Sequence, residues 1–158
     1  PHYAQGISAD RIAPNCTQLY KLEENEHPYA AKTEKETRVE REAGTNIVHV
    51  YMTTIRSHLA PDNIEGVKVG DKVYFHVTNL EQDFDVPHGF AMMGANNAEL
   101  LIMPGQTETL LWEPKREGVW PFYCTDFCSA LHQEMQGYVR VSAAGSDLPL
   151  KWWLGKSE

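Results

Sequence analysis

Four side chains that bind soft metal ions stand within twelve residues near the C-terminal end of this 158-residue chain. Cys124 and Cys128 are four positions apart, His132 follows four positions later, and Met135 comes three positions after that. Two thiols, an imidazole and a thioether at this spacing indicate a metal site, and the set needs one more imidazole from upstream. The fold must therefore bring a distant part of the chain to this loop.

The softness of the sulfur ligands narrows the choice of metal. Thiolate and thioether groups favour copper(I), zinc or iron–sulfur clusters, and imidazole suits copper and zinc. Zinc sites use cysteine, histidine and carboxylate rather than methionine, and an iron–sulfur cluster ordinarily takes four cysteines. Met135 therefore favours copper. The alternative is a Cys124–Cys128 disulfide beside an ordinary histidine, and the close spacing of His132 and Met135 argues against it.

The number of thiolates predicts the number of copper ions. A mononuclear blue-copper site needs one cysteine, two histidines and a weak axial methionine. Cys128, His132 and Met135, with one upstream histidine, already make that set, so Cys124 is one thiolate too many. If both cysteines bridge two coppers, each ion keeps two sulfurs and needs only one imidazole. The ligands then fit a two-copper, two-sulfur centre.

One upstream histidine stands out by its local sequence. His88 follows Pro87 and precedes Gly89, so that proline restricts the backbone before it and glycine permits close approach after it. In a β-sandwich, a histidine at a strand end can meet the loop between the last two strands, which is where residues 124–135 fall. Nothing beside the other strand histidines indicates a site, and we predict surface or hydrogen-bonded roles for His49, His58 and His76.

Hydrophobic alternation predicts an all-β domain. From residue 46 onward apolar residues recur with period two, most clearly at Val73, Phe75 and Val77. Breaks rich in glycine, proline and asparagine separate seven or eight short strands, which is typical of a Greek-key β-sandwich. The predicted strands cover 47–55, a strand end and turn at 66–71, then 73–78, 84–93, 98–103, 107–113, 119–123 and 137–142.

Composition divides the chain into three regions. Residues 1–45 are polar, include a mixed-charge run at 32–42 that we expect to be solvated, and are predicted to be a largely irregular N-terminal extension. Residues 46–142 form the predicted copper domain. In the tail, residues 143–158, the pair Trp152-Trp153 is too apolar for a solvated segment and should pack against another part of the protein.

Charge and hydropathy limit the partners. The formal net charge of −8 argues against nucleic acid and for basic partners that approach under electrostatic steering. No apolar run approaches the ~18 residues that a membrane helix needs, so we expect no membrane contact. The first residue is Pro1 rather than methionine, which indicates a processed or excised piece of a longer protein.

Two stretches resemble a known family. They read Asp85-Val-Pro-His-Gly-Phe90 and Pro121-Phe-Tyr-Cys-Thr-Asp-Phe-Cys-Ser-Ala-Leu-His-Gln-Glu-Met-Gln-Gly-Tyr-Val139. Together they are similar to the CuA cupredoxin domain at the C-terminus of nitrous-oxide reductase. Subunit II of cytochrome c oxidase shares the Cys-x3-Cys-x3-His-x2-Met spacing, but the run Phe127-Cys-Ser-Ala-Leu-His132 resembles the reductase more closely.

The resemblance implies a complete ligand set for a dinuclear copper centre. Two cysteines would bridge, and one imidazole and one weaker ligand would complete each ion. The bridges would be Cys124 and Cys128; one copper would take His88 and Met135, and the other His132 and the backbone carbonyl of Asp126. Many reductases of this kind have tryptophan where this chain has Asp126, a change that a carbonyl ligand tolerates.

The resemblance also implies a function in electron transfer. Electrons would enter from a cytochrome c or a small cupredoxin in the periplasm. They would leave to the catalytic CuZ centre of a propeller domain, on the partner subunit of a homodimer, where N2O is reduced to N2. Pro1-His2 resembles the end of that propeller, so His2 would be a severed CuZ ligand. Without the propeller this chain would be a relay and not a complete enzyme.

Two alternatives remain at this point. The first is the CuA domain of cytochrome c oxidase subunit II, which has the same ligand spacing. The second is a different class of protein: either a copper carrier or storage module, which would need an exposed and exchangeable site, or a structural zinc module, which would be colourless.

Overall fold

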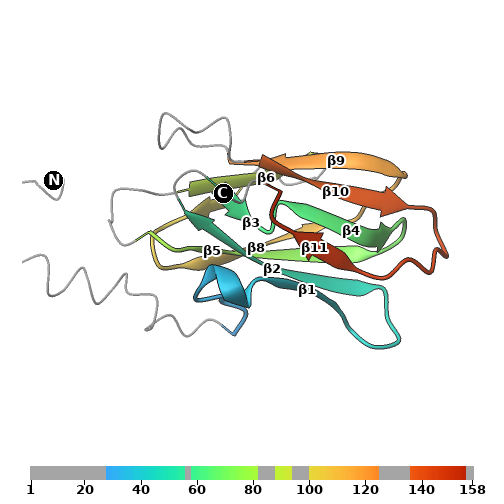
Figure 1. Cartoon of the computed structure of the whole chain (residues 1–158), viewed down its shortest axis with the longest axis horizontal. Coiled ribbons are helices and arrows are strands. Elements are labelled where there is room, and N and C mark those ends of the chain that lie inside the picture. Colours follow the sequence, from blue (N-terminus) through green and yellow to red (C-terminus); the bar gives the residue numbers. More distant parts are fainter. Residues whose placement is uncertain (1–27, 56–57, 82–87, 94–99, 125–135, 156–158) are drawn as a thin grey trace, which may run out of the picture.

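The computed structural model describes residues 28–55, 58–81, 88–93, 100–124 and 136–155. These residues form two β-sheets, shown in Figure 1. The first sheet has the strand order β1-β2-β5-β8, with β3 paired to β2. Strands β2 and β5 are parallel and the other pairs are antiparallel. The strands are β1 (Arg38–Arg41), β2 (Ile47–Ile55), β3 (His58–Ala60), β5 (Lys72–Asn79) and β8 (Thr107–Trp112), and a 3-10 turn, η2 (Glu34–Glu36), precedes them.

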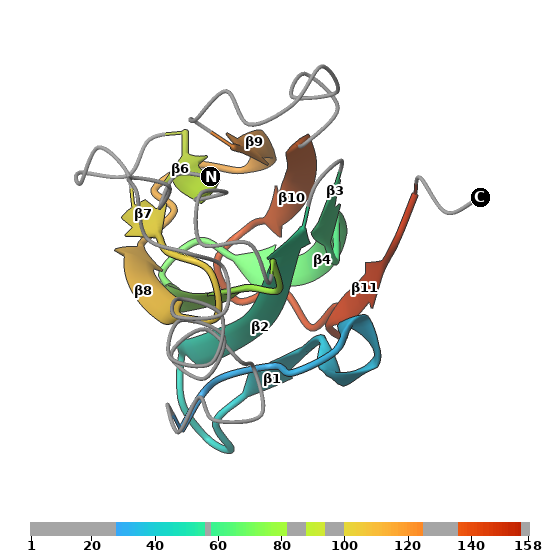
Figure 2. The ribbon, with the colours of Figure 1, turned by 90° about the vertical axis from the view of Figure 1, so that its left-hand side faces the viewer.

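The second sheet has the order β11-β4-β10-β9-β6-β7. Its only parallel pair among the described residues is β4 with β10. Figure 2 shows β9 and β10 on the opposite side of the molecule from β1. The strands are β4 (Asn63–Lys68), β6 (His88–Met92), β7 (Leu100–Ile102), β9 (Gly118–Tyr123), β10 (Gln136–Ser142) and β11 (Lys151–Trp153).

Three phenylalanines join the two sheets. Phe75 from the first sheet packs on Phe90 and Phe122 from the second, with ring centroids 5.3 and 6.0 Å apart. All three side chains are fully buried. Alternate residues of each strand face this core, because successive side chains of a strand point to opposite faces. The predicted all-β Greek-key sandwich is therefore confirmed.

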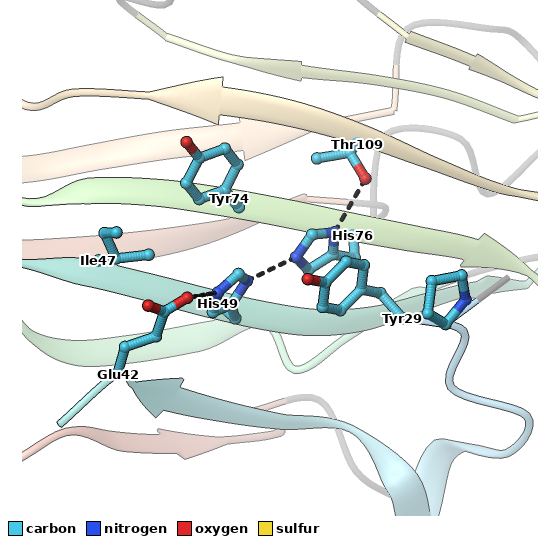
Figure 3. A pocket seen from close by; sticks show the side chains of 8 residues that line it. Tyr29, Glu42, Ile47, His49, Tyr74, His76 and Thr109 are labelled. Carbon is cyan, nitrogen blue, oxygen red and sulfur yellow. Dashed lines mark hydrogen bonds and ion pairs between the residues drawn. The ribbon is translucent and has the colours of Figure 1, made fainter.

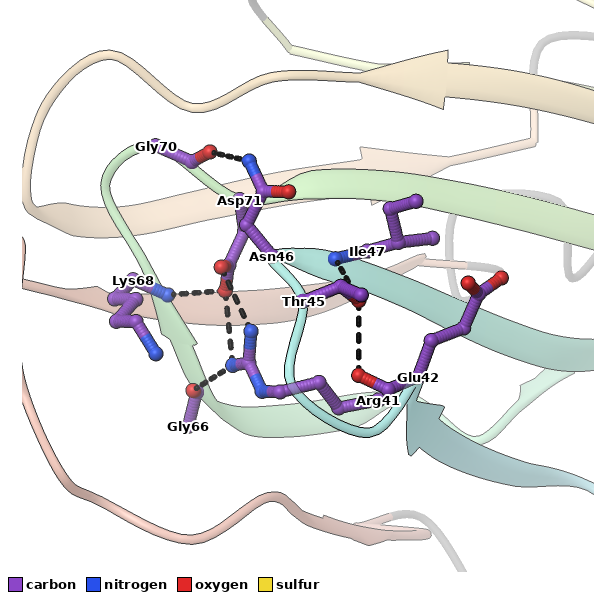
Figure 4. A network of polar contacts seen from close by, with 9 residues as sticks. All are labelled: Arg41, Glu42, Thr45, Asn46, Ile47, Gly66, Lys68, Gly70 and Asp71. Atoms are coloured by element: carbon purple, nitrogen blue, oxygen red, sulfur yellow. Dashed lines mark hydrogen bonds and ion pairs between the residues drawn. The ribbon is translucent and has the colours of Figure 1, made fainter.

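A buried ion pair fastens the N-terminal edge to the core. The guanidinium of Arg41 donates to both carboxylate oxygens of Asp71, over 2.8 and 3.0 Å, and to the carbonyl of Gly66 (Figure 4). Asp71 is fully buried and also accepts the backbone N–H of Lys68. Residues 38–41 belong to the run that we expected to be solvated, so that expectation is wrong for β1, where Val39 is buried too.

The C-terminal tail forms an edge of the second sheet. β11 pairs antiparallel with β4, which matches the expectation that Trp152-Trp153 packs against the protein. Gly66 makes the approach close, because a Cβ at its positive φ of 97° would lie 2.4 Å from the carbonyl oxygen of Pro149. The two tryptophans remain 40% and 39% exposed at this sheet edge.

Period-two alternation located most strands. Strands β2, β5, β8, β9 and β10 lie within one or two residues of their predicted bounds, and β6 and β7 end one residue before their predicted ends. Residues 84–87 and 98–99 of those last two predictions lie outside the described ranges. The alternation missed β1, β3, β11 and the first half of β4. In the part of the chain that the structure describes, no helix is long and apolar enough to span a membrane.

Candidate copper site

His88 is the first residue of β6, whose five residues are all buried. β6 lies between β7 and β9, and it runs antiparallel to β9 with Ala91 opposite Tyr123. The beginning of β6 therefore lies beside the end of β9, and Cys124 is the first residue after that end. Sheet register thus brings together two residues that are thirty-six positions apart in the sequence.

The donor atoms of these two residues are close enough to share one metal ion. The Sγ atom of Cys124 lies 3.9 Å from Nδ1 of His88. Typical metal–thiolate and metal–imidazole bonds of about 2.3 and about 2.0 Å together exceed that separation. Both residues are buried, His88 completely and Cys124 to 4% exposure. A soft thiolate and an imidazole in a dry interior suit copper, so these two members of the predicted ligand set fit the metal.

Glu81 fixes which nitrogen of His88 faces the cysteine. Its carboxylate lies 3.2 Å from Nε2 and accepts that N–H, so that Nδ1 carries the lone pair directed at Cys124. Metal-binding histidines commonly donate their outer N–H to a carboxylate in this way. Glu81 is in turn held by its backbone N–H, which donates to the Asn79 side chain over 2.8 Å.

Sequence reasoning missed Glu81. Three acidic residues, Glu81, Asp83 and Asp85, precede His88 within seven positions, and nothing in the sequence distinguishes them. A carboxylate shortly before a candidate histidine is a weak signal that could have been noted. The carboxylate that reaches the ring depends on where β5 ends, which only the fold reveals.

The surroundings of His88 change its pKa in opposing directions. Burial lowers the pKa, because the imidazolium form loses its hydration. Hydrogen bonds to Cys124 and Glu81, and the charges of those two groups, raise it. Together they outweigh burial, and the pKa of His88 lies above its ordinary value. A proton therefore competes with a metal ion for this residue.

The other predicted ligands lie outside the described residues. These are Asp126, Cys128, His132 and Met135, together with His2. Within the described ranges, no three His, Cys, Asp or Glu side chains converge to hold a metal ion. The structure thus brings His88 and Cys124 close together, and the ligand set as a whole stays a prediction.

Two of the histidines predicted to be structural are hydrogen-bonded, as expected. His49 Nδ1 lies 2.8 Å from His76 Nε2 on the outer face of the first sheet. The side chain of His58 lies outside the described part of the structure.

Comparison with known proteins gives relatives of two kinds. No protein-family model matches the chain. The chain is 36% identical over 99 residues to nitrous-oxide reductase of Stutzerimonas stutzeri, which is 63% of this chain and 15% of that protein. With the nitrous-oxide reductase of Cupriavidus necator it shares 32% identity over 126 residues, 80% of this chain and 19% of that protein. The chain therefore spans less than a fifth of the reductases' length.

The second kind of relative is matched over most of its length. Over 101 residues the chain is 34% identical to cytochrome c oxidase subunit 2 of Thermus thermophilus, which is 63% of this chain and 70% of that subunit. Among solved structures, a chain of a heme-copper terminal oxidase dimer superposes with a TM-score of 0.56. The two share 18% identity over 84% of this chain and 90% of that one, so this likeness concerns the fold alone.

Proposed function

Because the chain belongs to the family of CuA cupredoxin domains shared by nitrous-oxide reductase and cytochrome c oxidase subunit 2, we propose that it relays electrons through a dinuclear copper centre. The observation that carries the proposal is the buried approach of Cys124 Sγ to His88 Nδ1, at 3.9 Å. Cys128 would be the second bridge. The remaining ligands would be Met135, His132 and the backbone carbonyl of Asp126.

The residues of the chain would act by holding the ligands and excluding water. Bound copper would supply a one-electron redox couple. His88 begins β6 and Cys124 directly follows β9, its paired neighbour in the sheet, and Glu81 keeps the imidazole in one orientation. Close-packed interiors allow little movement, so the ligands would shift little between oxidation states. Small shifts mean a small reorganisation energy, which favours rapid electron transfer.

We place the domain in nitrous-oxide reductase. Electrons would arrive from a cytochrome c or a small cupredoxin in the periplasm and leave to the CuZ centre of a propeller domain, on the partner subunit of a homodimer. Two observations support this assignment: the match with a reductase extends over 126 residues, and the run from Phe127 to His132 resembles the reductase. His2 would then be a ligand of the CuZ centre.

Subunit 2 of cytochrome c oxidase is the second candidate. It is supported by the share of the relative's length that the chain covers, 70% for the oxidase subunit against 15% to 19% for the reductases. The two candidates differ in the acceptor. The reduced domain should be reoxidised by a nitrous-oxide reductase that retains CuZ but lacks its own CuA, and not by a heme-copper oxidase lacking its CuA. The reverse result would favour the oxidase.

Copper loading tests the centre itself. The loaded and desalted chain should hold two copper ions, should be purple when oxidised, and should show EPR hyperfine structure from two equivalent copper nuclei. A single tightly bound copper, or two ions with independent EPR signals, would contradict the dinuclear centre. An exposed carrier site would lose its copper quickly to a chelator, whereas this buried site should lose it slowly.

A further inference from the structure

A second group of potential ligands lies in a pocket on the outer face of the first sheet, away from the core (Figure 3). The pocket has a volume of about 490 Å³. Its polar groups come from three neighbouring strands, the residue after β1, and the segment that precedes η2. They belong to Tyr29, Glu42, His49, Tyr74, His76 and Thr109.

The register of the first sheet brings the two histidines together. In the parallel pair of β2 and β5, His49 is opposite Tyr74 and His76 is opposite Tyr51, so the two imidazoles lie on a diagonal. Both rings point away from the core, because the neighbouring residues of each strand, such as Val50 and Phe75, face inward. Thr109 on β8 lies directly opposite His76.

Each imidazole has its outer nitrogen engaged by another group. The carboxylate of Glu42 lies 2.7 Å from Nε2 of His49 and accepts that N–H, which leaves a lone pair on Nδ1. On His76, Nδ1 lies 2.8 Å from the hydroxyl oxygen of Thr109, which can accept its N–H and so leave the lone pair on Nε2. The inner nitrogens, Nδ1 of His49 and Nε2 of His76, are 2.8 Å apart. In the metal-free protein the two nitrogens share one hydrogen bond, with the Thr109 hydroxyl donating to Nδ1 of His76 when Nε2 carries the proton. A metal ion bound by both nitrogens would displace that proton.

The spacing of the inner nitrogens suits a transition-metal ion. With metal–nitrogen bonds of about 2.0 Å, a nitrogen separation of 2.8 Å corresponds to an angle of about 90° at the metal. Neighbouring positions of a tetragonal copper(II) or nickel(II) site subtend this angle. The outer hydrogen bond from His49 to Glu42 is the arrangement that orients metal-binding histidines.

Aromatic side chains hold the imidazoles in nearly parallel planes. The ring of Tyr29 stacks on His76 with centroids 4.1 Å apart and planes 10° from parallel. The planes of His49 and His76 differ by 16°. The stacking therefore restricts how far either imidazole can tilt.

From this geometry we propose that His49 and His76 form a second metal site for a divalent transition ion, with Cu²⁺ bound most tightly. Among first-row divalent ions, nitrogen sites bind Cu²⁺ most strongly. No third His, Cys, Asp or Glu joins them within the described residues, so water would complete the coordination. The pocket has room for several waters, each of which occupies about 30 Å³ in the liquid. The site contains no sulfur, lies outside the core, and is separate from the centre at His88.

The test adds Cu²⁺ to the full chain after its first site has been loaded with copper and excess metal removed. One further ion should bind, with an EPR signal showing nitrogen ligands and with no new thiolate-to-copper absorption band. In the same sample, amide NMR signals of β2 and β5 around His49 and His76 should broaden selectively. If only signals from other parts of the chain broadened, the proposal would be wrong. This outcome can be observed with the unmutated protein.

Three variants identify the ligands. His49→Gln should abolish the stoichiometric binding of the further ion, and Glu42→Gln should weaken it about tenfold by removing the carboxylate that orients the ring. The control is Tyr74→Phe, which alters the same pocket wall without removing a nitrogen and should bind Cu²⁺ like the unchanged chain. If His49→Gln binds the further ion as tightly as the unchanged chain, or if no further ion binds, the pair shares only a proton and the proposal fails. Both results can be interpreted whether the first site holds one copper ion or two. Failure of the proposed dinuclear centre would therefore not be mistaken for failure of this second site.

Discussion

The protein has two places where a glutamate carboxylate holds the outer nitrogen of a histidine, and they differ in burial and in sulfur. Glu81 lies 3.2 Å from Nε2 of His88, and Glu42 lies 2.7 Å from Nε2 of His49. The side chains of His88 and Glu81 are 0% and 10% exposed, whereas those of His49 and Glu42 are 12% and 49% exposed. The inner nitrogen faces a thiol in the first pair and an imidazole in the second.

The same arrangement, a carboxylate that orients a histidine, thus occurs in two different surroundings and would suit two kinds of metal site. A carboxylate orients an imidazole in either place, but a buried thiolate partner selects copper and keeps water away from it. An imidazole partner such as His76, although itself only 2% exposed, selects only by the general preference of nitrogen for copper(II), and the pocket beside the half-exposed Glu42 gives water a way in. We therefore expect slow exchange and electron transfer at His88, and rapid exchange at His49.

The largest expected effect comes from removing the buried imidazole. His88→Ala should abolish or severely distort the spectrum of the dinuclear centre, because one copper loses its only imidazole. The matched change in the outer pocket, His76→Ala, should leave that spectrum unchanged. Visible absorption and EPR spectra of the copper-loaded variants measure both. A distorted spectrum in His76→Ala with a normal one in His88→Ala would reverse the assignment of the two sites.

Removing one bridging sulfur should have the next largest effect. Serine remains protonated at neutral pH and is a poor ligand for copper(I), so Cys124→Ser removes a bridge without replacing it. The remaining predicted ligands, Cys128, His132, Met135 and His88, make a mononuclear set. We expect one copper per chain, a thiolate-to-copper charge-transfer band and slower electron transfer. A delocalised two-copper EPR spectrum from this variant would mean that Cys124 is not a bridge.

The carboxylates should matter less than the ligands, and each only at its own site. Glu81→Gln keeps the size of the side chain but removes the charge that favours the His88 orientation, and should weaken copper binding at that site about tenfold. Glu42→Gln should leave the affinity of that site unchanged. Chelator competition on the reduced proteins measures this affinity. Equal weakening by both variants would indicate that they act through overall charge and not through the imidazoles.

The smallest expected effect concerns the metal-free protein. Because the pKa of His88 is raised in the folded state, its proton stabilises the fold at pH values below the unfolded pKa of about 6.5. That contribution should disappear as the pH rises through the higher folded pKa. The free energy of unfolding, measured with urea across this pH range, should therefore change differently with pH in the unchanged chain and in His88→Gln. Parallel pH profiles for the two proteins would show that the histidine does not titrate as described.

Local patterns in the sequence were sufficient for most of the fold. Alternation of apolar residues reports which face of a strand is buried, and this is a property of neighbouring residues alone. It failed for β1, where Arg38 and Glu40 flank Val39, because an edge strand with one buried residue carries too weak a signal. Alternation also gave no indication that Arg41 belongs to a strand, because its charge is compensated by Asp71, which lies thirty positions away in the sequence.

The sequence by itself predicts the chemistry that we propose for the first site. The spacing of its thiols, imidazole and thioether depends on side-chain types within one short loop, and the context of His88 depends on its two neighbours. Only the tertiary structure decided which carboxylate orients that histidine, and that His49 and His76 meet at all. Their contact arises from the parallel register of β2 and β5, twenty-seven residues apart in the chain. Register is set by packing of the whole sheet on the core, so no local pattern encodes it.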